Sequence, residues 1–366
     1  MPIEAIVKVL FILVVMVVGI APVVTWIERK QSALMQDRIG ANRADVSGIT
    51  VLGLLHPAAD VIKLMTKEDV VPAGANRVMH LISPLIAAVP AIIAFAVIPY
   101  GGVYQFGDTT LNLVGADIDW GLLYIFAIGS IAAYGTVLAG WSSNNNWSML
   151  GGLRAAAQMI SYEVTMGLTV VGVFMVFETL RLSDMALAQD SIFWLFGAIP
   201  LPAWGILYQP LGFLMFLTAV MAENKRPPFD VPEGESEIIA GYHLEYSGMR
   251  FGLFFMSEFI GVIIIAALTA TIFLGGWAVP YLSTDTIIEG ISRFMGVGFA
   301  TGLCILIHFS TFMLKVFLMI WVQMLLRWSL PRFRYDQVMN LCWKILLPLS
   351  IVNIFATGLV LLWVKG

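Results

Sequence analysis

Residues 251–275 read FGLFFMSEFIGVIIIAALTATIFLG, an apolar run in which Glu258 is the single charged side chain. A helix that crosses the hydrocarbon core of a membrane needs about 20 mainly apolar residues. Because the hydrocarbon offers no water to the backbone, such a run must satisfy its own hydrogen bonds as a helix. Similar stretches recur along the chain and predict an all-α polytopic membrane protein with about eight spans, near residues 5–27, 79–99, 120–140, 157–178, 203–222, 251–275, 298–321 and 343–364.

The composition agrees with a membrane protein. Hydrophobic residues make up 59% of the chain, charged residues 12%, and the mean hydropathy is +0.88, whereas about a quarter of the residues in a soluble domain are charged. The net charge of -4 and the scattered basic residues argue against nucleic acid as a partner. Neither a repeat nor a flexible linker divides the sequence, so residues 1–366 are expected to form a single membrane domain.

The two cysteines, Cys304 and Cys342, lie far apart in apolar surroundings and form no CxxC pair. The sequence therefore predicts no metal ligand set and no iron–sulfur centre in this chain. If redox chemistry takes place, another chain is expected to bring the electrons.

The distribution of charge among the loops predicts the orientation of the chain in the membrane. Most basic residues lie in the loops that follow odd-numbered spans, and few lie in the opposite loops. By the positive-inside rule, the former loops are cytoplasmic and both termini face the periplasmic side of what is expected to be a bacterial inner membrane. The first span is followed by no small-residue cleavage site, so it is expected to be retained rather than removed as a signal peptide.

A shorter helix is predicted from Pro57 to Lys67, between the first two spans. Proline suits the first position of a helix, and Asp60, Lys63 and Lys67 share one stripe of an otherwise apolar surface. The helix is too short to span and is expected to lie at the membrane interface. It could be an ordinary surface anchor or the rim of an entry path for an amphiphilic substrate, and its composition favours the anchor.

Ionisable residues within the predicted spans are costly to insert and are therefore candidates for function. They are Glu163, Glu258, His308 and Lys315. A buried carboxyl group can act as a proton relay, since desolvation keeps it neutral and a nearby charge ionises it. The alternative is a buried Lys–Glu pair that fixes the register of two helices. The sequence leaves both possibilities open, and it does not identify the partner of Lys315.

An unusually acidic loop, residues 223–250, separates the fifth and sixth spans. Pro227, Pro228 and Pro232 forbid a continuous helix there and predict a bent connection followed by a short helix. In such a helix Glu233 and Glu237 would lie on the same face as like charges four residues apart, and their protonation would be coupled. A plain solvated loop is the alternative, but the neighbouring segments PPF, IIAGY and LEYSGM are of a kind that packs.

The loop and its flanks, ENKRPPFDVPEGESEIIAGYHLEYSGMRFGLFFMSEF, resemble the signature of the quinone-binding membrane subunit of respiratory complex I, the proton-pumping NADH:quinone oxidoreductase. Four further stretches carry the same resemblance nearly from end to end: WIERKQSALMQDRIGANR with HPAADVIKLMTKEDVVP, GWSSNNNWSMLGGLRAAAQMISYEV, LGFLMFLTAVMAE and RWSLPRFRYDQVMNLCWK. The resemblance implies an eight-helix subunit at the junction of the membrane and peripheral arms.

The same resemblance implies the partners and the chemistry. Cytoplasmic loops would complete a quinone chamber with peripheral-arm subunits, one of which carries the terminal iron–sulfur cluster, and small membrane subunits would lie alongside. The flavin mononucleotide and the iron–sulfur clusters belong to partner subunits, and this chain binds membrane lipid and the quinone substrate without a cofactor of its own. Acidic residues would couple quinone reduction to proton translocation.

The resemblance to this family implies functional roles for individual residues, which are assigned position by position. Those implied in proton coupling are Glu163, Glu223, Asp230, Glu233, Glu235, Glu237, Glu245 and Glu258. Those implied in lining the quinone chamber and its mouth are Glu28, Arg29, Arg38, Asp60, Glu68, Arg154, Arg226 and Phe229.

Two departures from the family pattern lie near the implied entrance. The usual Gly-Pro-Asn is Gly40–Ala41–Asn42 here, and His56 replaces the usual glutamine before Pro57. We interpret His56 as a residue that makes a simple hydrogen bond at the start of the helix.

The alternatives in function are a homologous subunit of a hydrogenase or of a ferredoxin- or F420-linked complex and, from another class, a stand-alone ion transporter.

Overall fold

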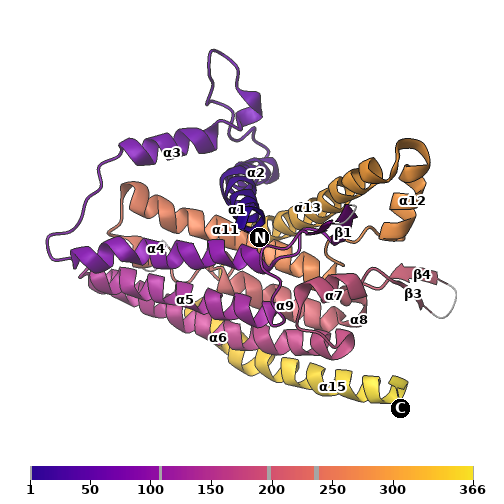
Figure 1. Cartoon of the computed structure of the whole chain (residues 1–366). Helices are drawn as coiled ribbons and strands as arrows, with labels where there is room; N and C mark the ends of the chain where they lie inside the picture. Colours follow the sequence, from indigo (N-terminus) through magenta and orange to yellow (C-terminus); the bar gives the residue numbers. More distant parts are fainter. Residues whose placement is uncertain (1, 107–108, 196–198, 235–238, 366) are drawn as a thin grey trace.

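The computed structural model describes residues 2–106, 109–195, 199–234 and 239–365 (Figure 1). In these ranges seven helices are long and apolar enough to cross a membrane, and they confirm the prediction of an all-α polytopic membrane protein. They are Ile6–Met35, Arg77–Val97, Gly121–Ser142, Asn146–Phe177, Gly248–Phe273, Val297–Ser329 and Tyr335–Val364. Several of these helices extend well beyond the predicted apolar core, because helical backbone continues into the polar flanks.

The fifth predicted span is shorter than expected. In place of a continuous helix over residues 203–222, the structure has a short helix α8 (Gly205–Tyr208) and a 14-residue helix α9 (Pro210–Glu223). Pro210 has no N–H and disfavours helical backbone at the residue before it, and Gln209 accordingly has φ -132 and ψ 60. At 1.5 Å per residue, α9 by itself is too short for a hydrocarbon core about 30 Å thick.

The long helices are divided into named elements. The first consists of α1 (Pro2–Phe11), a π-helical segment η1 (Ile12–Ile20) and α2 (Ala21–Met35). The remaining long elements are α4 (Arg77–Ala94), α5 (Gly121–Ser142), α6 (Asn146–Phe177), α11 (Gly248–Phe273), α13 (Val297–Ser329), α14 (Tyr335–Asn340), the π-helical η5 (Leu341–Leu346) and α15 (Leu347–Lys365).

The connections contain short elements. Helices α3 (His56–Thr66), α7 (Leu182–Ala188) and α12 (Thr284–Met295) are accompanied by the 3-10 turns η2 (Val51–Gly53), η3 (Phe95–Val97) and η4 (Gly241–His243). Two antiparallel hairpins pair β1 (Val103–Phe106) with β2 (Thr109–Asn112), and β3 (Ile192–Leu195) with β4 (Ile199–Pro202). Figure 1 shows α3 and the β3–β4 hairpin at opposite ends of the bundle.

The bundle is layered around α6 and α11. Helices α4, α5 and α6 pack in chain order, α15 and α9 cover α6, and α11 packs against both α4 and α13 (Figure 1). Small residues allow this close approach. A Cβ added at Gly135 of α5 would lie 2.6 Å from the backbone nitrogen of Ala87 in α4, and one at Gly151 of α6 would lie 2.7 Å from the Cα of Gly241. The second contact seats η4, and with it Tyr242, against α6.

The predicted helix between the first two spans is present as α3. It packs against α2 and α11, and the apolar side chains of Val61, Ile62 and Met65 remain exposed, as an interfacial helix requires. His56 at its first residue differs from expectation, since its Nε2 accepts hydrogen bonds from the backbone N–H groups of Arg43 and Ala44, at 3.0 and 3.2 Å. His56 thus anchors the preceding loop rather than the start of its own helix.

Candidate functional site

The chain reverses direction immediately after α9. Lys225 adopts a left-handed backbone with φ 53, the N–H of Arg226 bonds to the carbonyl of Met221, and the N–H of Phe229 bonds to the carbonyl of Arg226. This is the bent connection that the prolines predict. Its effect is to turn the Lys225 and Arg226 side chains into the protein, where both are at least nine-tenths buried.

A single glutamine holds this reversal in place. The buried side-chain amide of Gln158, on α6, donates to the carbonyl of Ala222 at 2.8 Å and to that of Phe229 at 2.7 Å. Both carbonyls belong to the bend, and the Ala222 carbonyl also accepts from the backbone N–H of Lys225. Buried carbonyls are costly to leave without a partner. The bend is therefore fixed to α6 at two points.

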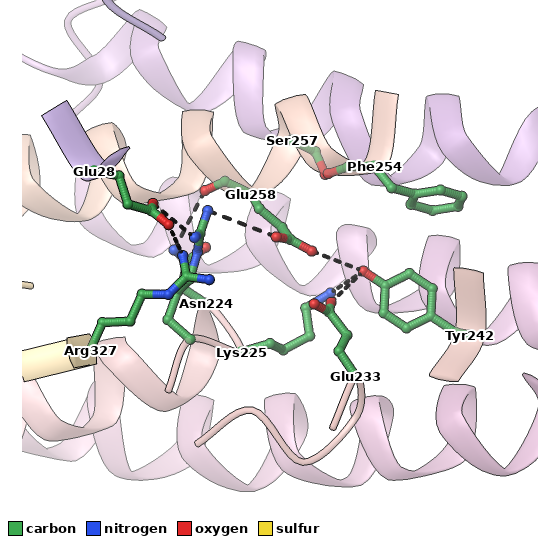
Figure 2. A network of polar contacts seen from close by, with 10 residues as sticks. Glu28, Asn224, Lys225, Glu233, Tyr242, Phe254, Ser257, Glu258 and Arg327 are labelled. Carbon is green, nitrogen blue, oxygen red and sulfur yellow. Dashed lines mark hydrogen bonds and ion pairs between the residues drawn. The ribbon is translucent and has the colours of Figure 1, made fainter. Parts of the chain in front are cut away.

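The guanidinium group of Arg226 joins two carboxylates from distant helices. It lies 3.2 Å from Glu28 of α2 and 3.8 Å from Glu258 of α11, and it stacks over the Phe259 ring at 4.5 Å. Arg327 of α13 pairs with the other oxygen of Glu28 (Figure 2). All of these charged side chains are at least three-quarters buried. Four separate parts of the chain thus supply one compact ionic network.

Tyr242 extends the network toward the acidic loop. Its hydroxyl oxygen lies 2.9 Å from Glu233 Oε1, 3.3 Å from Glu258 Oε1 and 3.2 Å from Lys225 Nζ (Figure 2). Burial raises the pKa of the Tyr242 hydroxyl well above its usual value, and the two neighbouring carboxylates raise it further. The hydroxyl consequently keeps its proton at physiological pH.

A cavity of about 140 Å³ lies beside these residues, between α4, α5, α6, α9 and α11. Glu163, Glu223 and Glu258 line it together with Lys225 and Tyr242. Ser130 of α5 donates a hydrogen bond to Glu163, whereas Glu223 Oε2 is buried without a hydrogen-bond partner in the part of the chain that the structure describes. A space of this volume with polar groups on its wall is large enough for water. The cavity thus joins carboxyl groups from three helices.

Other predicted residues lie outside this buried network. Arg29 and Asp60 form an ion pair that ties α2 to α3, and Asp230 pairs with Arg332 at 3.0 Å. Glu245 accepts a hydrogen bond from Asn145 at 2.6 Å. The remaining side chains are distributed as follows: Arg38 and Glu68 are exposed, Arg154 is half-buried with its guanidinium 5.8 Å from the Tyr335 ring, and Phe229 is buried between the rings of Tyr162 and Phe333.

Two predicted acids, Glu235 and Glu237, lie outside the described residues, as does most of the short helix expected after Pro232. Conversely, the structure places Tyr242, Arg327 and Ser130 in contact with the predicted acids, and Lys225 in contact with Tyr242, although the sequence did not single them out. In the sequence, Lys225 resembles an ordinary basic residue of a loop, and Tyr242 belongs to a segment that is expected to pack against the protein. Their proximity to the acids arises from chain reversals that the linear spacing does not show.

No group of three or more His, Cys, Asp or Glu side chains in the described ranges is arranged to hold a metal ion. The arrangement instead suits the movement and storage of protons, because it combines several carboxyl groups, a hydroxyl and a small cavity with partners that both donate and accept.

Comparison with known proteins gives the family. The family model described as NADH dehydrogenase matches residues 7–358. This chain belongs to the NADH dehydrogenase family. Among its relatives, the H subunit of the NADH-quinone oxidoreductase of Thermomicrobium roseum is 44% identical over 356 residues, which cover 97% of this chain and 96% of the relative.

Other members of the NADH dehydrogenase family align equally far. An H subunit of the NADH-quinone oxidoreductase of Geobacter metallireducens is 44% identical over 94% of this chain and 93% of its own length. The corresponding protein of Bdellovibrio bacteriovorus is 40% identical over 96% of this chain and 94% of its own length. The alignments therefore include all the elements that build the buried network.

Proposed function

We propose that this chain is the membrane subunit of a proton-translocating NADH–quinone oxidoreductase, in which it forms part of the quinone chamber and couples quinone reduction to proton movement. The membership of the family and the names of the relatives support the assignment to this enzyme complex. The observation that carries the coupling role is the buried network, in which Arg226 joins Glu28 to Glu258, and Glu258 lines a cavity together with Glu163 and Glu223.

The chemistry follows from charge. Reduction of a quinone takes up two electrons and two protons, and a transient change of charge near Arg226 would alter the proton affinity of the carboxyl groups around it. Because Glu258 contacts both Arg226 and Tyr242, it would pass this change toward the cavity and Glu163. Electrons would come from a flavin and iron–sulfur clusters on partner subunits, since this chain is proposed to carry no redox centre.

The residues of the first cytoplasmic loop and α3 fit the mouth of the chamber. The pair of Arg29 with Asp60 joins the first span to α3, whose apolar face is exposed. A long-tailed quinone would enter between the first span, α11 and α3. We also propose that both termini lie on the periplasmic side of a bacterial inner membrane, which the bias of basic residues toward the other loops supports.

The decisive test replaces Glu258 by Gln in the assembled complex. We expect NADH:quinone turnover and proton translocation in inside-out vesicles to fall at least roughly tenfold, with NADH oxidation by a hydrophilic artificial acceptor unchanged. Glu289→Gln is the matched control, because Glu289 of α12 is exposed and lies outside the network. Wild-type quinone turnover and pumping in Glu258→Gln would exclude the coupling role.

The partners are tested by purification in mild detergent. We expect this chain to copurify with peripheral subunits that carry flavin and iron–sulfur clusters, and with small membrane subunits. Copurification with a nickel–iron module would assign the chain to a hydrogenase complex instead, and isolation as a solitary, ion-transporting protein would contradict the proposal.

A further inference from the structure

The Tyr242 hydroxyl has as many polar neighbours as a hydroxyl group can serve. A phenol offers one proton and two lone pairs. Three polar atoms surround this one, namely Lys225 Nζ, Glu233 Oε1 and Glu258 Oε1, at 3.2, 2.9 and 3.3 Å (Figure 2). Lys225 is a donor only, so it occupies one lone pair. One proton and one lone pair then remain for the two carboxyl groups.

This count constrains the protonation of the carboxyl groups. The hydroxyl can donate to Glu233 or to Glu258, but not to both. The second carboxyl group completes the arrangement only when it is itself protonated and donates to the remaining lone pair of the hydroxyl. The geometry therefore favours one shared proton between the two acids, and two equivalent arrangements of the same hydrogen bonds differ in which acid holds it.

We propose that Tyr242 relays a proton between Glu233 of the acidic loop and Glu258 of α11. In the forward step, protonated Glu233 gives its proton to the Tyr242 oxygen as the tyrosine gives its own proton to ionised Glu258. One O–H bond forms and one breaks on the tyrosine, one carboxylate is protonated as the other ionises, and no net charge accumulates on the phenol. This relay rests on the proposed coupling function and supplies its connection from the loop into the membrane.

The surroundings favour a relay over ionisation of the phenol. Burial and the adjacent acids raise the pKa of Tyr242, so a phenolate would be costly and the incoming and outgoing protons must move together. The ring is fixed edge-on against Phe254 at 5.4 Å and against His243 at 5.0 Å. Burial also lowers the pKa of His243, which keeps that imidazole neutral. This packing restricts the ring and therefore the position of the hydroxyl between the two acids.

Lys225 is assigned as the positioning residue of the relay. Its left-handed backbone at φ 53 places Nζ 3.2 Å from the hydroxyl and 4.6 Å from the centre of the Tyr242 ring. By occupying one lone pair, the ammonium group leaves only the direction between the two acids for proton exchange. Its charge, together with that of Arg226 on the far side of Glu258, also offsets the charge of whichever carboxylate is ionised, whereas Glu223 and Glu163 around the cavity are further acids.

The test compares two tyrosines that share one packing partner. Tyr242→Phe removes only the relay hydroxyl. Tyr246→Phe is the matched control, since its ring also packs edge-on against Phe254, at 5.0 Å, while its hydroxyl contacts Ser142 rather than an acid. In inside-out vesicles that contain the complete complex, NADH:quinone turnover of Tyr242→Phe should fall roughly tenfold or more, and its solvent deuterium isotope effect should rise because proton transfer becomes rate-limiting. Tyr246→Phe should match the wild type in both.

The readouts separate a relay from a structural role. An unchanged rate in Tyr242→Phe would overturn the relay, as would a slower rate without a larger isotope effect or an equal loss in Tyr246→Phe. Lys225→Met should also raise the isotope effect, and Lys225→Arg should restore the wild-type isotope effect. A wild-type isotope effect in Lys225→Met would contradict the positioning role of Lys225. If Glu258→Gln itself keeps wild-type turnover, the coupling function fails; if Glu258→Gln is impaired and Tyr242→Phe is not, only the relay fails.

Discussion

Two buried polar clusters, one beside the first half of α11 and one beyond its C-terminal end, satisfy their charges in different ways. In the first half, Glu258 shares Arg226 and Tyr242 with other acids. Beyond its end, Lys315 of α13 donates to the backbone carbonyls of Gly276 and Ala278, at 2.9 and 2.7 Å. The first cluster contains acids and a hydroxyl that can exchange protons, whereas the hydrogen-bond partners of the lysine are backbone carbonyls, which are fixed dipoles.

The second cluster is completed by aromatic groups. The amine of Lys315 lies 5.1 Å from the centre of the Trp204 ring, and buried His308 contacts the hydroxyl of Tyr104 and the Trp277 ring. Lys315 thus pairs with backbone carbonyls and an aromatic face, which suits a residue that secures the chain after α11. The two clusters thus differ in whether the groups bonded to the buried charge can exchange protons.

The largest effect on stability is expected from Arg226→Gln. This change leaves Glu28 and Glu258 buried with less compensation, and breaking a buried ion pair typically costs about 3–5 kcal/mol. Thermal denaturation of the purified complex should show this loss of stability as a lower melting temperature. Arg334→Gln is the control, since Arg334 and its partner Asp336 are 72% and 61% exposed and exposed pairs contribute at most about 1 kcal/mol. Equal losses in both variants would contradict the distinction between buried and exposed pairs.

An intermediate effect is expected from Lys315→Met, which removes the two hydrogen bonds to Gly276 and Ala278. The variant should lose about 1–3 kcal/mol of stability, because two buried carbonyls lose their charged donor. The ratio of proton translocation to quinone turnover should not change. A fall in that ratio would remove the functional distinction between the two clusters, since Lys315 would then take part in proton coupling.

The smallest effect concerns Asp190, near the same end of the molecule. Burial raises the pKa of Asp190 from 3.8 to about 6, with a smaller contribution from the charge of Asp285 and against the opposing charge of Lys315. A raised carboxyl pKa means that the folded state prefers the protonated form, so stability is fully present below pH 3.8 and is lost as the pH rises through 6.

Asp190→Asn should therefore stabilise the complex above pH 6 by about 1 kcal/mol, a value already reduced for the partial exposure of Asp190. Melting temperatures measured at about pH 4 and about pH 8 should diverge from the wild type only at the higher pH. A gain of equal size at both values would show that charge on Asp190 is not the cause.

The long apolar runs made the helical architecture predictable, because a spanning backbone has no alternative to internal hydrogen bonding. The prolines after Arg226 likewise predicted the bend. The break at Gln209 was missed, since Pro210 lies within an otherwise continuous apolar stretch and could have been a kink inside one helix. Composition identifies apolar length but does not decide where a proline interrupts it.

The candidate site was predictable in its residue types and only partly in its contacts. Glu163, Glu223 and Glu258 do meet at one cavity. Sequence spacing did not identify the partners of Arg226; the left-handed backbone at Lys225 directs the guanidinium to Glu28 and Glu258. Asp230 pairs with Arg332, which lies far along the chain.

The linear sequence establishes that this chain is a helical membrane protein, that its acids gather in one loop and a few spans, and that it resembles a subunit of a quinone-reducing complex. These properties depend on apolar length, loop charge and motifs, which are local along the chain. The folded chain alone reveals that one tyrosine hydroxyl lies between Glu233 and Glu258 and that Lys315 binds backbone carbonyls. Such contacts join residues from separate elements, so they depend on how the helices and bends pack and not on spacing along the chain.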